Sequence, residues 1–197
     1  QRQMCIRDRG EVVQPGTYAL SAFSTVFHAL YRAGGVNDIG SLRKVQLVRN
    51  GKKMATIDVY DFIMHGKTQD DIRLEEGDVV IVPTYESLVQ ISGNVKRPMR
   101  YEMKNGETVE TLIGYAGGFT SDAYTKSLRM VRQNGKEYQV NTIDDKDYAS
   151  YRLSDGDMVT AEAILDRFTN KLEIRGAVYR PGIYELNDNV NTVKALI

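Results

Sequence analysis

Tryptophan is absent from this 197-residue sequence, which contains one cysteine, two histidines and four prolines. One cysteine excludes both an internal disulfide bond and a metal site built from several cysteines. Charge of one sign is also missing, because 26 basic and 26 acidic residues cancel, and they cancel separately within residues 1–92 and 93–197. Without a basic excess, we do not expect the chain to bind nucleic-acid phosphates. The longest aliphatic run, Val79–Val82, is far too short to span a bilayer.

The residues that are plentiful favour a folded, strand-rich chain. Glycine occurs 17 times, tyrosine 12 times, and 42% of the residues are hydrophobic. This composition predicts many turns and strands and enough core for one or two domains. Residues 1–9 differ in character, because four of the nine are charged and no clean alternation is present. We interpret residues 1–9 as a foreign or disordered leader.

A nine-residue segment occurs three times. It covers residues 10–18, 93–101 and 176–184, and each copy keeps Gly, Val, Pro and Tyr at the same places. The interval from the first copy to the second equals the interval from the second to the third. A fixed period of this kind indicates repeated structural units, which must be recognised before the elements are assigned.

Two further markers follow the segment in both complete copies. An Ala-Gly-Gly sequence ends at Gly35 and at Gly118, separated by the same period, whereas a Leu-x-x-Gly-Asp sequence ends at Asp78 and at Asp157, which are closer together. The second copy has therefore lost four net residues between these markers, and we expect the difference to lie in a loop.

Each marker predicts a local backbone conformation. Residues 89–92 and 172–175 alternate apolar with polar side chains, as half-buried strands do. Pro15-Gly16 and Pro181-Gly182 are typical of a type II turn, in which glycine takes a positive φ. Met99 replaces this glycine in the second copy, so we expect a different turn there.

Helices and hairpins are predicted in the same order in both copies. Apolar residues at i, i+3, i+4 and i+7 indicate helices over 26–33 and 109–116, each ended by the glycine that follows. Strands follow at 45–48 and 128–131, and Asn50-Gly51 and Asn134-Gly135 favour hairpins after them. Last strands are expected at 79–82 and 158–161. Hairpin, helix and later strands together predict an α+β fold of the β-grasp type.

A β-grasp unit with these motifs in this order resembles the SLBB (soluble ligand-binding β-grasp) domain. Tandem copies are most similar to the outer-membrane polysaccharide export family. We therefore expect a leader at 1–9, SLBB domain 1 at 10–85, SLBB domain 2 at 88–164 and a truncated third SLBB domain at 171–197. Two residues before the repeated glycine, the second and third copies have Ile91 and Ile174, but the first copy has Asp8. We therefore expect the first strand of the first copy to be lost or to be formed by the leader.

Few side chains suggest catalysis or metal binding. His28 falls on a predicted helix and His65 in a predicted loop, without a second histidine at ligand spacing. Asp144, Asp145 and Asp147 lack the order of a calcium loop and indicate a solvated acidic turn. The repeated Asp78 and Asp157 are explained by local hydrogen bonds to backbone at a tight turn. We predict no catalytic residue, no metal site and no cofactor.

The tips of the predicted hairpins are the strongest candidate contacts. Lys96-Arg97 and Tyr179-Arg180 precede the repeated proline, and such side chains can stack on a sugar, pair with an acidic sugar or contact another subunit. We rank a subunit interface first, bare solvent second and sugar contact third. Tyr18, Tyr101 and Tyr184 recur in every copy and are interpreted as core packing.

The resemblance implies a function without catalysis. In the export family such domains form periplasmic rings around a conduit for polysaccharide, so the expected partners are further copies of the chain, a polysaccharide and an inner-membrane export protein. The expected location is the periplasm, with attachment to the outer membrane through segments outside this sequence. The alternative is a soluble β-grasp receptor for a small glycan or another small ligand.

Overall fold

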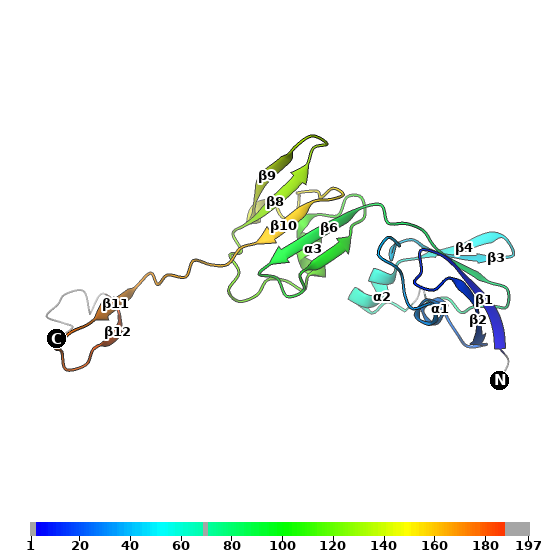
Figure 1. The fold of residues 1–197 in the computed structure, drawn as a ribbon, viewed down its shortest axis with the longest axis horizontal. Coiled ribbons are helices and arrows are strands. Elements are labelled where there is room, and N and C mark those ends of the chain that lie inside the picture. Colours follow the sequence, from blue (N-terminus) through cyan, green and yellow to red (C-terminus); the bar gives the residue numbers. More distant parts are fainter. Residues whose placement is uncertain (1–2, 69–70, 188–197) are drawn as a thin grey trace. The chain divides into compact units, whose positions relative to one another are not determined.

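A computed structural model describes residues 3–68 and 71–187. The chain divides into two compact units, Gln1–Ala163 and Ile164–Ile197, and each is described by itself. The first unit contains two successive halves of the same architecture (Figure 1). Within the described ranges, no helix has the length and apolar character needed to cross a membrane.

The first half is a five-stranded mixed sheet with two short helices. Strand order is β2-β1-β5-β3-β4, and the central strands β1 and β5 run parallel while the other pairs are antiparallel. Helix α1 packs against β1 and β2. The elements are β1 (Gln3–Gly10), β2 (Gly16–Ser21), α1 (Val26–Arg32), β3 (Val45–Arg49), β4 (Lys52–Ile57), α2 (Val59–His65) and β5 (Val79–Val82).

The second half repeats this plan. Its strand order is β7-β6-β10-β8-β9, with the central β6 and β10 parallel, and α3 lies behind the sheet in Figure 1. Two mixed sheets with few helices confirm the predicted α+β class. The elements are β6 (Leu88–Gly93), β7 (Met99–Glu102), α3 (Val109–Tyr115), β8 (Ser127–Gln133), β9 (Tyr138–Asp144), the 3₁₀ helix η1 (Asp145–Asp147) and β10 (Met158–Ala161).

Both predicted helices and their ends are confirmed. The apolar stripe of each helix faces the core, so that in α1 Val26 and Ala29 are fully buried and in α3 Val109 and Leu112 are fully buried. The glycine that follows each helix has the positive φ of a helix-ending residue, 79° after α1 and 78° after α3.

The type II turn predicted at Pro15-Gly16 and Pro181-Gly182 is wrong. Both glycines lie in strands, β2 and β12 (Gly182–Glu185), and neither has a positive φ. The positive φ falls instead on the repeated glycine, with 81° at Gly93. A Cβ atom there would lie 2.1 Å from the carbonyl oxygen of Ala161 on β10, so the two central strands approach too closely for any side chain. This close approach explains why glycine recurs at this place in both sheets.

Residues 3–9 of the leader are not disordered but form most of β1. This strand pairs with β2 and with β5, so the leader supplies the first strand that the second copy forms from its own repeat. Its foreign origin stays a prediction. Asp8 occupies the core-facing place of Ile91, is 1% exposed and has no hydrogen-bond partner for either carboxylate oxygen. Burial raises the pKa of Asp8 to about 6.

We expect Asp8 to make stability depend on pH. A carboxyl group whose pKa is higher in the folded state stabilises the fold most below its unfolded pKa near 4, and this contribution is lost as the pH rises through about 6. The loss reaches about 3 kcal/mol, because the free energy changes by roughly 1.4 kcal/mol for each pH unit between the two pKa values. Asp8→Ile should remove this dependence and raise stability at pH 7. Urea unfolding of the parent chain and of Asp8→Ile, repeated between pH 4 and 7, measures the free energy of unfolding of each protein at each pH. The same change of this free energy with pH in both proteins would contradict the prediction.

The net difference of four residues combines two changes: the β8–β9 hairpin is longer than the β3–β4 hairpin, and this is outweighed by a shorter segment after β9 than after β4. The first half has the helix α2 there, whereas the second has only η1. Helix α2 was not predicted, because the segment shows no long apolar period. His65, expected in a loop, is the last residue of α2. Both hairpins are confirmed, with a tight turn at Asn50 and Gly51 and a longer connection around Gly135.

The second unit contains an antiparallel hairpin of β11 (Lys171–Ile174) and β12. By the period of the sequence, these strands correspond to the first hairpin of each sheet. The helix expected after this hairpin falls mainly on residues 188–197, outside the described residues, and the truncated third domain stays a prediction.

Candidate functional site

The tip between β6 and β7 is tied to the end of α3. The backbone N–H of Lys96 donates to the carbonyl of Gly118 (3.0 Å), and that of Arg97 donates to Ala116 (2.9 Å). The Arg97 side chain lies over Gly117, where a Cβ atom would be 3.3 Å from Nε. Arg97 therefore covers the carbonyl end of the helix, where a positive charge is favourable.

The other predicted pair, Tyr179-Arg180, belongs to the second unit. Tyr179 is 97% exposed, and the Arg180 guanidinium carbon lies 6.0 Å from the centre of its ring. The two pairs thus belong to different units. A subunit interface or sugar contact at either pair stays a prediction.

The repeated tyrosine closes the tip in all three copies. Its hydroxyl donates to the carbonyl oxygen four residues earlier, over 2.5 Å in Tyr18, 2.9 Å in Tyr101 and 2.7 Å in Tyr184. Core packing describes Tyr101, which is 2% exposed, but Tyr184 is 36% exposed. The hydrogen bond is thus the property common to the three copies.

An ion pair between a partly exposed arginine and a fully buried aspartate recurs at the turn before the last strand of each sheet. Arg49 holds Asp78 through two hydrogen bonds of 2.8 and 2.9 Å, and Arg132 holds Asp157 through two of 2.8 and 2.7 Å. Neither aspartate side chain is exposed to solvent. The predicted hydrogen bonds to backbone are also present, because each carboxylate accepts the N–H three residues earlier in the turn, over 2.8 Å.

The arginine partners were missed at the sequence level, although a signal was present. Arg49 and Arg132 are themselves separated by the period of the repeat, and each stands near the end of a predicted strand. Hydrogen bonding to the aspartate raises the pKa of both guanidinium groups above the ordinary value. The arrangement is structural, since each aspartate is fully occupied by its arginine and its turn.

The other acidic and imidazole candidates are also engaged locally. The His28 ring lies 2.7 Å from the Thr25 hydroxyl and caps the start of α1. On η1, Asp145 pairs with Lys126 over 2.9 Å at the surface. The contact of Asp145 agrees with the interpretation of a solvated acidic turn, whereas the capping role of His28 was not predicted.

A buried arginine joins the two halves of the first unit. The Arg43 side chain is 5% exposed; its Nε lies 2.9 Å from the Asp58 carboxylate and its Nη2 3.0 Å from Glu107 Oε1 across the junction. Nη1 also donates to the carbonyl of Glu102 (3.1 Å). The guanidinium lies over the Tyr60 ring at 4.5 Å. Burial by itself lowers the pKa of Arg43, but its hydrogen bonds to the two carboxylates outweigh this and raise it.

Glu102 reinforces the same junction from the second half. Its carboxylate accepts the Ser41 hydroxyl (2.6 Å) and the Leu42 N–H (2.8 Å), and its own N–H donates to the Tyr60 hydroxyl (2.9 Å). Lys104 pairs with Asp58 beside these bonds. Each of these polar groups has a partner, so the two halves meet through a specific polar network rather than an apolar surface alone.

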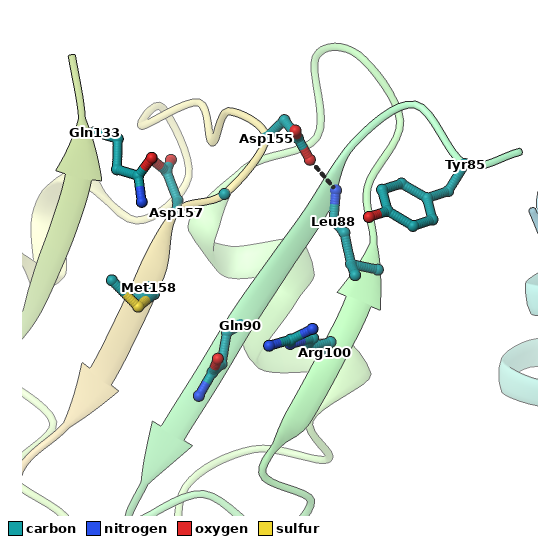
Figure 2. A pocket seen from close by; sticks show the side chains of 9 residues that line it. Tyr85, Leu88, Gln90, Arg100, Gln133, Asp155, Asp157 and Met158 are labelled. Carbon is teal, nitrogen blue, oxygen red and sulfur yellow. Dashed lines mark hydrogen bonds between the residues drawn. The ribbon is translucent and has the colours of Figure 1, made fainter. Parts of the chain in front are cut away.

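An open hollow lies on the face of the second sheet that α3 does not cover (Figure 2). Its volume is about 270 Å³. Two carboxylates at its upper end are already engaged, because Asp155 accepts the Leu88 N–H (2.7 Å) and Asp157 is held by Arg132. The lining residues are Tyr85, Leu88, Gln90, Arg100, Gln133, Asp155, Gly156, Asp157 and Met158.

Comparison with known proteins first defines the class. A family model described as SLBB domain matches residues 4–82, and a second model of the same description matches residues 88–141. The two matches fall on the two halves described above, so the chain carries two SLBB domains.

The same chain is similar to two proteins named for polysaccharide transport. Two curated proteins of Escherichia coli, both described as polysialic acid transport protein KpsD, are each 28% identical over 105 residues. The match covers 52% of this chain and 19% of each relative, so the aligned part is about a fifth of their length. The chain therefore carries tandem SLBB domains and, over about half of its length, is similar to proteins named for polysialic acid transport.

Proposed function

We propose that the chain is a non-catalytic, periplasmic module of a polysaccharide export protein that assembles into a ring forming part of the translocation conduit. Support comes from the two SLBB domains and from the relatives named for polysialic acid transport. Attachment to the outer membrane, and contact with an inner-membrane export partner, belong to the same proposal.

The junction around Arg43 is the observation that carries this proposal. A ring repeats one interface around an axis, and the repeat closes only if each subunit has a fixed shape. Buried hydrogen bonds between the two halves restrict their relative rotation, as a simple flexible linker would not. We propose that each half is a β-grasp unit, which agrees with a hairpin, a crossing helix and parallel first and last strands.

Mass measurement of the full-length parent protein in detergent tests the ring. We expect a closed oligomer of defined mass, whereas a strict monomer would overturn the proposal. Calorimetry of this chain with monosaccharides tests the alternative of a soluble receptor, which predicts tight and saturable binding of one small ligand.

A further inference from the structure

Arg100 is an unpaired positive charge in the hollow of the second sheet. It is exposed on β7 opposite Gln90 on β6, and within the described residues its side chain makes neither a hydrogen bond nor an ion pair. At the other end of the hollow, Asp157 is paired with Arg132, whereas Asp155 is exposed and accepts the Leu88 N–H through one oxygen. Among the described lining residues, Arg100 is therefore the free cation of the hollow, and a carboxylate ligand would bind at its end of the hollow, which is not the end that carries Asp155.

The surroundings of Arg100 fit a ligand rich in hydroxyl groups. Gln90 and Gln133 present amides that can both donate and accept, with one N–H of Gln133 already donated to the Tyr138 hydroxyl (3.3 Å), and Tyr85 contributes an aromatic ring at the rim (Figure 2). An arginine fork binds a carboxylate through two parallel hydrogen bonds. Amides, a ring and a free guanidinium together match a sugar that carries a carboxylate.

The hollow continues along the strands, as a groove for a polymer would. A second depression of about 320 Å³ shares Gln90 and Arg100 with the first and extends to Ser92, Pro98 and Met99. Arg100 therefore lies where the two depressions meet. A chain of sugars could occupy both depressions, with one acidic residue at the guanidinium.

We propose that this groove binds a carboxylate-bearing segment of polysaccharide, with Arg100 pairing the carboxylate and Gln90 and Gln133 contacting hydroxyl groups. This inference rests on the proposed export function and specifies its substrate class. The corresponding position of the first domain is Thr17, and the matching depression there is lined by Arg7 and Arg9 instead, so Arg100 is a feature of the second domain's groove.

Titration of the isotopically labelled 197-residue chain, followed by amide NMR, tests the groove. The probes are an oligomer of a carboxylated sugar, a neutral glucose oligomer of equal length and inorganic phosphate. We expect the carboxylated oligomer to shift the amides of β6 and β7 with saturation and the other two probes to bind at least about tenfold more weakly. Equal shifts with phosphate would indicate a general anion site and overturn the proposal.

Arg100→Gln should weaken binding of the carboxylated oligomer about tenfold, since a charged hydrogen bond is lost. Arg129→Gln is the matched control, because Arg129 lies on β8 of the same sheet and is already paired with Glu162 (2.8 Å). Unchanged amide spectra away from the groove establish that both variants are folded. Unaltered binding by Arg100→Gln would overturn the groove but leave the ring proposal standing, since the mass measurement tests that separately.

Discussion

Replacing Arg43 with methionine should separate the two SLBB domains and destabilise the first unit by roughly 3 to 5 kcal/mol. The reason is that the buried carboxylate of Asp58 and the half-buried carboxylate of Glu107 would lose their common partner. The amides of Leu42 and Glu102 report the junction directly, because each donates a hydrogen bond across it. Their hydrogen exchange should become much faster in the variant, and the radius of gyration in solution scattering should increase.

The second repeat provides a matched control for Arg43. Lys126 stands at the equivalent position, but its side chain is 71% exposed and pairs with an exposed carboxylate. Lys126→Met should therefore leave both the exchange rates and the scattering unchanged. Arg43→Lys keeps the positive charge but lacks the planar guanidinium group. It should therefore preserve only part of the hydrogen bonding across the junction. Slow exchange at Leu42 in Arg43→Met would show that the network does not hold the domains together.

Asp157→Ala should unfold the second domain, or bring it close to unfolding. The substitution removes a fully buried carboxylate that accepts two hydrogen bonds from Arg132 and one from the Ser154 N–H, and the loss of these bonds, two of them charge-assisted, costs roughly 3 to 5 kcal/mol. A single domain has only about 5 to 15 kcal/mol of stability in total. Hydrogen exchange resolved by peptide should show lost protection in β6, β8 and β10.

The first domain allows the same experiment on its own ion pair. Asp78→Ala removes the equivalent carboxylate and should reduce protection in β1, β3 and β5 first. The double variant Arg132→Met with Asp157→Leu removes both charges together and should be less destabilised than Asp157→Ala, since no charge is left unpaired. If either single variant reduced hydrogen-exchange protection equally in both domains, a local role for the ion pair would be contradicted.

Local patterns predicted much of the fold because their causes lie within a few residues. The stripe of Val26, Ala29 and Leu30 requires a helix with one buried face, and Asn50-Gly51 requires a tight turn. The failures came from contacts between distant strands. The repeated Gly93 is explained by the carbonyl of Ala161, at the far end of the same domain, and not by the neighbouring Pro98.

The candidate sites were less predictable than the elements. The tip residues Lys96 and Arg97 stand out because they precede a repeated proline, yet the groove around Arg100 has no sequence signature. Gln90 and Gln133 meet at its edges only because β6, β10 and β8 are neighbours in the sheet. Side chains from strands that are far apart in sequence cannot be grouped before the strand order is known.

By itself, the sequence determined the period of the repeat, the α+β class, the order of most elements and the family resemblance, because each depends on local spacing that recurs. Only the tertiary structure decided that the two domains are joined through Arg43 and Glu102. Those contacts link positions 59 to 64 apart in the chain, and the equivalent of Arg43 in the next repeat is an exposed lysine. A bond across a domain junction depends on how two folded surfaces meet, which no local pattern encodes.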